Sequence, residues 1–302
     1  MKSITRKTLL YKSGVEYADY GLNHVEGCSH GCTFPCYAMM MKKRCGIIKS
    51  YNEWVQPKIV SNSLELLDNE LPRLKNKIQN VFLCFSTDPF MYEQPEVNDL
   101  TLKIIERLNN YNIKVISVSK GIYPKELTNT KKYGSTNDYG STVVSLDERY
   151  RKIYEPGAAP LKERVKALEQ LHNAGLSTWV SMEPYPTPNI VEQDLHEILN
   201  EIKFVDKIVF GKWNYSKKVS NYQEYKEFYN STAAIVIDFC KRNGTDFHIK
   251  DGTISDKSIE KNSSESDTLR EYINDNLNEN SSSANMFSKR ASQFKLPICL
   301  TK

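Results

Sequence analysis

The feature that most constrains the fold is a regular alternation between apolar runs of strand length and amphipathic helical stretches. Residues 81–85 form a continuous apolar run, and the stretch that follows places Ile104, Ile105 and Leu108 on one helical face. Strands that are apolar on both faces are typical of a parallel sheet covered by helices. Counted from residue 20, the pattern predicts six such strands and a weaker seventh at residues 247–250. The sequence therefore predicts an α/β fold, either a (β/α) barrel or an open sheet.

Polar side chains gather at the carboxyl end of each predicted strand. These clusters are the cysteine-rich stretch at residues 28–36, Ser86 to Asp88, Ser119 with Lys120, residues 145–147, Glu183 with Pro184, and Gly211 with Lys212. In barrels and open sheets of parallel strands, the active site lies at this end. An ordinary α/β protein whose strands end in polar turns would explain any one cluster, but it explains six in series poorly. We therefore expect a functional site at the carboxyl ends of the strands.

Three of the seven cysteines fall within nine residues, at positions 28, 32 and 36. Three thiolates this close in sequence can hold one metal centre from a single loop. No fourth cysteine follows until Cys45, so one coordination position stays open. An iron–sulfur cluster with one free iron fits this pattern. A zinc ion whose shell is completed by His24, His30 or Cys45 fits it as well.

Composition places the chain among ordinary globular proteins. Of its 302 residues, 39% are hydrophobic and 26% are charged, which is close to the average of soluble domains. No apolar run approaches the roughly 20 residues of a membrane span, and the first residues lack the apolar core of a signal peptide. We therefore expect no membrane association and a cytoplasmic location, where seven cysteines indicate metal ligation or free thiols rather than disulfides. The net charge of +4 permits a polyanionic partner but does not demand one.

The chain divides into three parts by composition. Residues 1–19 form a basic and then polar–aromatic N-terminal segment, and residues 20–254 contain the strand–helix alternation. Residues 255–302 are polar and of low complexity, with serine- and asparagine-rich runs that are typical of linkers. We expect one α/β domain followed by a polar linker and a C-terminal tail.

Five short motifs lie in order along residues 20–215. They are Gly27-Cys28-Ser29-His30-Gly31-Cys32, Cys36-Tyr37-Ala38, Ser86-Thr87-Asp88-Pro89-Phe90, Ser119-Lys120-Gly121 and Glu155-Pro156-Gly157-Ala158-Ala159-Pro160. Together they resemble the motifs of the radical S-adenosylmethionine superfamily, and most of all those of the branch similar to spore photoproduct lyase. One departure is the CX3CX3C spacing, because residues 33–35 make the second gap three residues long where the usual gap is two. The resemblance implies a partial (β/α)6 TIM-type barrel of parallel strands with helices outside.

The resemblance also implies the cofactors. Cys28, Cys32 and Cys36 would hold three irons of a [4Fe–4S] cluster, and the fourth iron would take the amino and carboxylate groups of S-adenosylmethionine. One electron, supplied by a donor such as flavodoxin or ferredoxin, would then cleave S-adenosylmethionine to a 5′-deoxyadenosyl radical. A structural zinc usually joins two separated ligand pairs and closes its shell, which makes zinc the weaker alternative.

The same resemblance predicts which residues contact the cofactors. Phe34 and Tyr37 flank the cysteines and would pack against the cluster or the adenine, or else against the core. Lys120 is a cation suited to the cofactor's carboxylate, and Ser145 would hydrogen-bond the ribose. Hydroxyl and carboxylate acceptors at residues 86–88 suit the amino group of the cofactor. The full predicted set of cofactor-binding residues is Phe34, Tyr37, Ser86, Thr87, Asp88, Ser119, Lys120, Ser145 and Lys212.

Further candidates lie where a substrate would sit, at the ends of the fifth and sixth strands. They are Glu183, Lys212, Trp213 and Asn214. Glu183 is a candidate catalytic residue, and so is Cys84, which shares a face with Ser86 on an alternating strand. Cys84 could donate a hydrogen atom, although a buried free cysteine is more commonly a small apolar residue. Glu155 and Arg149 are expected to form a structural ion pair.

Three functions remain open from the sequence. The first is a radical S-adenosylmethionine enzyme that acts on a nucleic acid or nucleotide, which is favoured by the resemblance, the mild basic charge and 18 tyrosines available for stacking. The second is an enzyme with the same radical chemistry and a peptide or small metabolite as its substrate. The third is a non-catalytic nucleic-acid-binding protein with a structural zinc.

Overall fold

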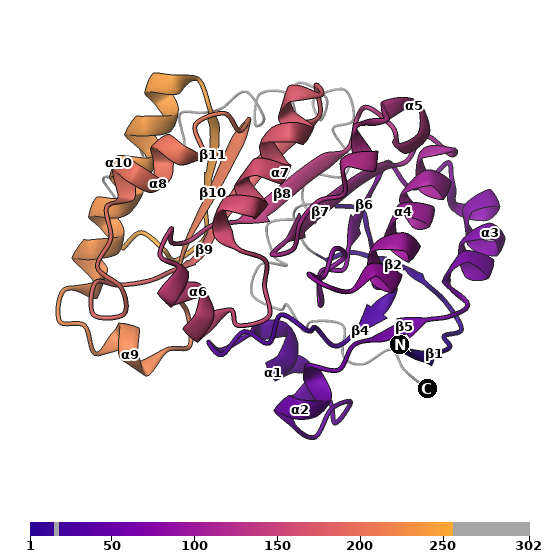
Figure 1. Cartoon of the computed structure of the whole chain (residues 1–302), viewed down its shortest axis with the longest axis horizontal. Helices are drawn as coiled ribbons and strands as arrows, with labels where there is room; N and C mark the ends of the chain where they lie inside the picture. The colour runs from indigo at the N-terminus through magenta and orange to yellow at the C-terminus, as the bar shows by residue number, and fades with distance from the viewer. Residues whose placement is uncertain (15–17, 256–302) are drawn as a thin grey trace, which may run out of the picture.

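The computed structural model describes residues 1–14 and 18–255 of the chain. Figure 1 shows a curved sheet running across the molecule, with helices packed along its outside. The predicted C-terminal tail lies, from residue 256 onward, outside the described residues.

The main sheet has eight strands in the order β11-β10-β9-β8-β7-β6-β3-β2. Neighbouring strands are parallel, apart from the antiparallel pair of β2 and β3. Within the described residues β2 and β11 each pair with one neighbour, so the sheet stays open. The predicted parallel α/β fold is confirmed, including the weak seventh strand, β11. The strands are β2 (Leu10–Lys12), β3 (Tyr20–Leu22), β6 (Asn80–Leu83), β7 (Lys114–Ser119), β8 (Asp138–Thr142), β9 (Ser177–Tyr185), β10 (Lys207–Lys212) and β11 (Asp246–Ile249).

Helices between consecutive strands cover the sheet with their apolar faces. The helix α4, for example, begins with a proline in its first turn, a position that proline tolerates, and buries Val97, Ile104 and Leu108. The helix α7 is followed by Gly175, whose φ of 80° lies in the left-handed region that favours glycine after a helix end. None of the described helices is long and apolar enough to cross a membrane. These helices are α3 (Ser63–Leu74), α4 (Pro95–Asn109), the 3-10 helix η1 (Lys125–Thr128), α5 (Thr130–Tyr133), α7 (Leu161–Asn173), α8 (Leu195–Glu201) and α10 (Tyr225–Asn243).

The carboxyl ends of the strands carry a second layer of short elements. A small three-stranded sheet has the order β1-β5-β4, with β1 (Lys2–Ile4), β4 (Val25–Glu26) and β5 (Lys58–Val60). Figure 1 shows further short helices along the same edge. They are α1 (Tyr37–Arg44), α2 (Tyr51–Trp54), α6 (Glu148–Tyr154) and α9 (Lys217–Ser220).

The first predicted strand, at residues 20–26, is divided between the two sheets. β3 ends at Leu22, and β4 leaves the main sheet to pair with β5. The polar side chains of Asn23 and His24 interrupt the strand, because they hydrogen-bond to Tyr11 and Thr101 rather than packing across a sheet. This break lets the chain leave the main sheet just before the cysteines.

Candidate active site

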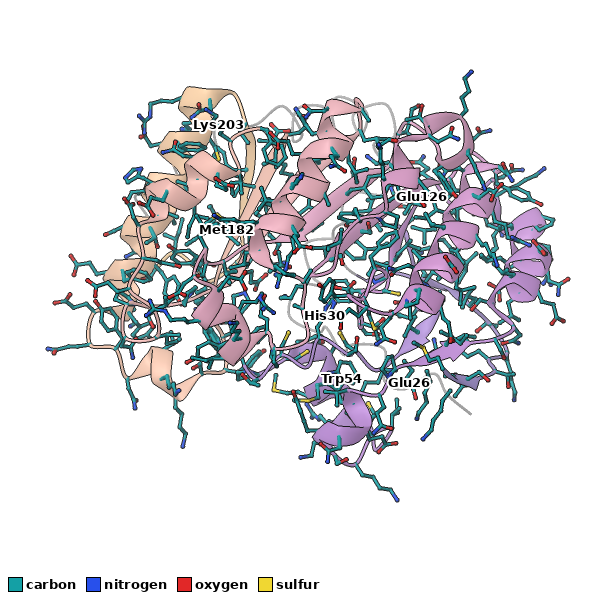
Figure 2. The ribbon with its side chains drawn as sticks, in the orientation of Figure 1. Glu26, His30, Trp54, Glu126, Met182 and Lys203 are labelled. Carbon is teal, nitrogen blue, oxygen red and sulfur yellow. The ribbon has the colours of Figure 1, made fainter. Side chains whose placement is uncertain are left out.

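The loop at residues 27–36, here called the cysteine loop, packs tightly on α2. Gly27 and Gly31 have φ values of 84° and 57°, which favour glycine. A Cβ atom at Gly27 would lie 2.7 Å from the carbonyl oxygen of Trp54, and one at Gly31 would lie 2.7 Å from the hydroxyl of Tyr51. The backbone N–H of Cys28 donates to the same Trp54 oxygen at 2.9 Å. These close contacts fix the path of the loop, and Figure 2 shows His30 of the loop and Trp54 on this side of the molecule.

The opposite side of the cysteine loop is bonded to α6 and to the segment that follows it. The N–H of Thr33 donates to the carbonyl of Tyr154 at 3.0 Å, and the N–H of Gly157 donates to the carbonyl of His30 at 2.9 Å. Thr33 is exposed and Phe34 is buried. Residues 33–35, which separate Cys32 from Cys36, are one residue longer than the usual gap. The loop accommodates this length because Thr33 bulges outward and bonds to α6.

The three loop cysteines lie close enough for their charges to interact. Burial, followed by the charges of Asp88, Cys32 and then Cys36, raises the pKa of the Cys28 thiol well above its usual value. Burial also raises the pKa of Cys32 to about 12. Three neighbouring thiolates in a buried loop need a cationic partner, and thiolates are the usual ligands of iron in iron–sulfur clusters. The donor set of Cys28, Cys32 and Cys36 therefore fits a [4Fe–4S] cluster.

The alternative zinc site has less support from its proposed fourth ligands. His30 and His24 each have both ring nitrogens engaged within the protein. Cys45 follows α1 and is half-buried. In the parts of the chain that the structure describes, no three His, Cys, Asp or Glu side chains are placed to hold a single metal ion.

Asp88 joins the cysteine loop to the ends of two strands. Its Oδ1 accepts hydrogen bonds from the N–H of Phe90 at 2.9 Å and the hydroxyl of Ser119 at 2.7 Å. Its Oδ2 accepts from the N–H of Lys120 at 2.9 Å and lies 3.3 Å from Nδ1 of His30. Burial raises the pKa of Asp88, but His30 and these hydrogen bonds outweigh burial and lower the pKa below its usual value. All four acceptor directions of the Asp88 carboxylate are thus used within the protein.

The tautomer of His30 follows from its partners. The N–H of Tyr92 donates to Nε2 at 3.0 Å, so Nε2 carries a lone pair and the proton sits on Nδ1, facing Asp88. Ser86 and Thr87, the other predicted residues of this strand end, are half-buried. Ser86 donates from its N–H and its hydroxyl to Asn23 at 3.2 and 3.1 Å. Asp88 therefore contacts the cysteine loop, whereas Ser86 contacts Asn23 in the segment that leads into the loop.

Lys120 lies between the cysteine loop and a buried ion pair. Its Nζ is 5.6 Å from the centre of the Phe34 ring and 3.8 Å from Oε1 of Glu155. Glu155 also pairs with Arg164 at 2.8 Å. The predicted pair of Glu155 with Arg149 is wrong, because Arg149 lies on the exposed face of α6 and pairs with Asp147.

Arg164 was not predicted as a site residue, although the sequence carries a signal for it. It sits on the apolar stripe of α7 beside Val165 and Leu168, where a charged side chain needs a buried partner. Its side chain is fully buried. A single charged residue on an otherwise apolar helical face marks such positions.

The remaining predicted site residues differ in burial. Ser145 lies three residues beyond the end of β8, is buried, and its hydroxyl accepts from the N–H of Asp147. Tyr37, the first residue of α1, is 43% exposed and points away from the core. Lys212 ends β10 and is half-buried, and Glu183 in β9 packs against Gly211.

Aromatic rings close the space between the cysteine loop and β10. The rings of Phe34 and Trp213 are 5.6 Å apart, and those of Trp213 and Tyr154 are 5.4 Å apart. Trp213 is only 4% exposed, whereas its neighbour Asn214 is exposed. Trp213 thus shields this end of the sheet interior from water.

The expected strand alternation at Cys84 does not hold. β6 ends at Leu83, and Cys84 has a φ of 54°, outside the extended region. Its sulfur is 3.4 Å from Nδ1 of His24, whose Nε2 is 2.7 Å from the hydroxyl of Thr101 in α4. Burial raises the pKa of this thiol to about 12. The thiol therefore faces His24 and α4. The face shared with Ser86 was predicted wrongly because the strand ends at Leu83, two residues before the end of the apolar run at residues 81–85.

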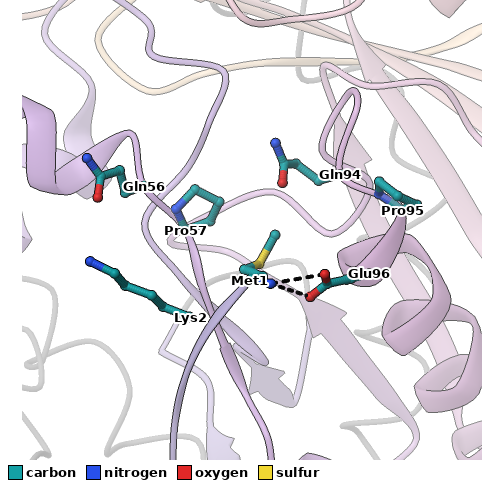
Figure 3. A pocket seen from close by; sticks show the side chains of 7 residues that line it. All are labelled: Met1, Lys2, Gln56, Pro57, Gln94, Pro95 and Glu96. Atoms are coloured by element: carbon teal, nitrogen blue, oxygen red, sulfur yellow. Dashed lines mark hydrogen bonds and ion pairs between the residues drawn. The ribbon is translucent and has the colours of Figure 1, made fainter.

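A surface pocket of about 260 Å³ lies next to the small sheet, and Figure 3 shows the ion pair of the Met1 ammonium with Glu96 inside it. Its lining residues are Met1, Lys2, Gln56, Pro57, Gln94, Pro95 and Glu96. None of them belongs to the predicted site.

Comparisons with known proteins point to one superfamily. A sequence model described as the radical SAM superfamily matches residues 22–202, more than half of the chain. The uncharacterized protein ORF301 of Acidianus two-tailed virus is 25% identical over 195 residues, which cover 63% of this chain and 64% of that protein. The chain thus matches somewhat less than two thirds of this relative's length.

Two solved structures have the same fold at low sequence identity. A point mutant of spore photoproduct lyase superimposes with a TM-score of 0.56 at 13% identity, covering 82% of this chain and 81% of that one. A double mutant of the same enzyme, with bound AdoMet and dinucleoside spore photoproduct, gives a TM-score of 0.58 at 13% identity, covering 81% and 80%. At this identity the likeness is one of fold.

Proposed function

The chain belongs to the radical SAM superfamily, and from this membership we propose that it is an enzyme that cleaves S-adenosylmethionine reductively at a [4Fe–4S] cluster. The observation that carries the proposal is the cysteine loop itself. Two packing contacts and three backbone hydrogen bonds hold the cysteine loop, which carries Cys28, Cys32 and Cys36, at the carboxyl edge of a parallel sheet. This edge is where enzymes with parallel strands place their active sites.

Each residue of the site has a separate task in this proposal. The three cysteines bind three irons, and the bound cluster supplies the one-electron chemistry that protein side chains lack. Lys120 provides a cation for the carboxylate of the cofactor, and its side chain is 16% exposed. Phe34 and Trp213 exclude water from this region.

Asp88 acts through other groups. By accepting from the N–H of Lys120 and from His30, it fixes the backbone that presents Lys120 and the loop that presents the cysteines. Ser86 and Thr87 remain the residues proposed to accept hydrogen bonds from the amino group of the cofactor.

Anaerobic purification tests the cluster and the reaction together. We expect a brown protein with about four irons per chain that forms 5′-deoxyadenosine from S-adenosylmethionine when dithionite is added. Cys32→Ala should lose the cluster and the product, whereas Cys45→Ala should keep both. A colourless protein that binds zinc and leaves S-adenosylmethionine intact would overturn the proposal.

A nucleic acid or nucleotide is the substrate class that we propose. Basic side chains on α6 and α9 surround the carboxyl edge, among them the exposed Lys152, Lys217 and Lys218, and Tyr215 beside them is 75% exposed. Exposed cations and aromatic rings are what single-stranded nucleic acids bind. The dinucleoside bound by a structural neighbour is a further support.

Fluorescence anisotropy with a labelled single-stranded oligonucleotide tests this choice. Binding should weaken as salt rises, and it should weaken strongly in the double variant Lys217→Glu/Lys218→Glu. The matched control is Lys131→Glu/Lys132→Glu on α5, at the other end of the sheet. Absence of binding, or equal loss in both double variants, would favour a peptide or a small metabolite instead. We propose flavodoxin or ferredoxin as the physiological electron donor.

A further inference from the structure

Three charged side chains, here called the charge triad, lie together at the carboxyl edge, where two are buried and one is partly exposed. They are Lys120, Glu155 and Arg164. The side chain of Arg164 is completely buried and that of Glu155 is 1% exposed. Two cations and one anion leave the triad with a net charge of +1. Burying charges costs more free energy than a single ion pair usually returns, so the triad is weakly explained by stability alone.

The triad lies beside Cys32. Two backbone hydrogen bonds, from Thr33 to Tyr154 and from Gly157 to His30, join the neighbours of Cys32 to the neighbours of Glu155. Lys120 reaches the same place from the end of β7, where its ammonium lies over the ring of Phe34, two residues from Cys32. These contacts place the triad next to the part of the cysteine loop that carries Cys32.

The charges of the triad are incompletely compensated. Arg164 donates from Nε to the carbonyl of Ala159 at 2.7 Å and from Nη1 to the carbonyl of Thr142 at 3.1 Å. Within the described residues, Nη2 of Arg164 and Oε1 of Glu155 are buried without a hydrogen-bond partner. The 3.8 Å between Glu155 and Lys120 is also too long for a hydrogen bond. Charges that are buried and unscreened act over longer distances than charges in water.

We propose that the charge triad sets the reduction potential of the iron–sulfur cluster bound through Cys32, with Lys120 and Arg164 raising the potential and Glu155 lowering it. The inference rests on the proposed cluster. Reduction adds one electron to the cluster from an external low-potential donor, and no bond is made or broken. A positive charge nearby stabilises the more negative, reduced state, so charge near a cluster shifts its potential.

The test is a redox titration of the reconstituted protein without S-adenosylmethionine, followed by electron paramagnetic resonance. Lys120→Met and Arg164→Met each remove a positive charge and should shift the midpoint potential to more negative values. Glu155→Gln removes the negative charge and should shift it to more positive values. Opposite signs for variants in one buried group are not expected from a general loosening of the structure.

A matched control exists on the same strand. Lys114 begins β7, pairs with Asp138 at 2.6 Å and lies at the far end from the cysteines. Lys114→Met and Asp138→Asn should leave the midpoint potential unchanged. Iron content and circular dichroism establish that each variant is loaded and folded.

Each outcome decides the question. Unchanged potentials, or shifts of one sign in all three triad variants, would overturn the proposal. If Arg164→Met or Glu155→Gln fails to fold or load, the partly exposed Lys120 decides alone, since an unmoved potential in Lys120→Met is sufficient to reject the idea. If the unmodified protein forms no four-iron cluster, the proposed function itself has failed, and iron analysis distinguishes that case.

Discussion

Strand β7 carries a lysine at each end, and the two lysines lie in opposite environments. Lys114 at the amino end is 38% exposed and makes a 2.6 Å ion pair with Asp138. Lys120, just past the carboxyl end, is 16% exposed and sits 3.8 Å from Glu155 within a buried group. The ion pair with the shorter distance contributes little to stability, because it is exposed and solvent screens it. The charge triad, whose charges are poorly compensated, lies beside the cysteines. We infer that the arrangement of charges at the carboxyl end serves the chemistry of the site rather than the stability of the fold.

The sharpest test of this contrast is the removal of Arg164. Arg164→Met leaves Glu155 buried with only a distant partner, and breaking a buried pair in this way costs about 3–5 kcal/mol. Urea denaturation of the protein without cofactors should show a loss of this order in the free energy of unfolding. A loss below about 0.5 kcal/mol is typical of a surface substitution. It would mean that the charges at the carboxyl end of β7 affect stability no more than those at its amino end.

A loss of similar size is expected from acid, through His24 at the carboxyl end. Burial, and to a lesser degree the charge of Arg6, lowers the pKa of His24 from 6.5 to about 3. The unfolded chain takes up the proton first as the pH falls, so the stabilising contribution is complete above pH 6.5 and is lost toward pH 3. Each pH unit in this window should cost about 1.4 kcal/mol.

Unfolding measurements between pH 7 and pH 4 check this prediction. His24→Gln should flatten the pH dependence of the free energy of unfolding. His172→Gln, a change in a histidine at the opposite end of the sheet that is 33% exposed, should leave it as it is. Equal slopes for the unmodified protein and His24→Gln would contradict the assignment.

The contact of Gly157 with the cysteine loop should also be sensitive. A Cβ atom there would lie 2.2 Å from the carbonyl oxygen of Ser29. Gly157→Ala must displace the loop, at a cost of about 1–3 kcal/mol for overpacking, and should reduce the iron bound per chain. Thermal unfolding and iron analysis give the two readouts. Gly14→Ala, whose new methyl group would have no atom of the described residues within 4 Å, is the control, and equal effects of both changes would argue against a packed loop.

The smallest effect belongs to the amino end. Lys114→Met breaks an exposed pair and should cost about 0.2–1 kcal/mol, less at high salt. Denaturation at low and high salt measures both parts of the prediction. A loss as large as that of Arg164→Met would mean that the two ends do not differ in the way described.

The sequence was informative where a pattern repeats. The order of parallel strands and helices follows from apolar periodicity, and the gathering of residues 86–88, Ser119 and Lys120 beside the cysteines follows from topology, since carboxyl ends of parallel strands share one edge. These inferences need only the positions of elements along the chain. They hold even where strand boundaries shift, as at β8, which ends at Thr142 and leaves the polar cluster at residues 145–147 beyond the strand.

Details that depend on one backbone angle or on one partner distant in sequence could not be predicted from the sequence. The side chain of Cys84 contacts His24 instead of sharing a face with Ser86, because the φ of Cys84 is positive. No local sequence pattern predicts that backbone angle. The partner of Glu155 was misassigned because Arg149 is near in sequence, whereas Arg164 reaches Glu155 through the packing of α7 on the sheet. Such pairings are set by tertiary structure rather than by spacing.

The bonds between the cysteine loop and α6 have a consequence for the order of folding. The hydroxyl of Thr33 bonds to the carbonyl of Ile153, a partner 120 residues away. Contacts so distant in sequence form late, because the chain between them must first be organised. We expect the loop to reach its final shape only after β8 and α6 have assembled. The proposed cluster would then be retained only by chains in which β8 and α6 have assembled.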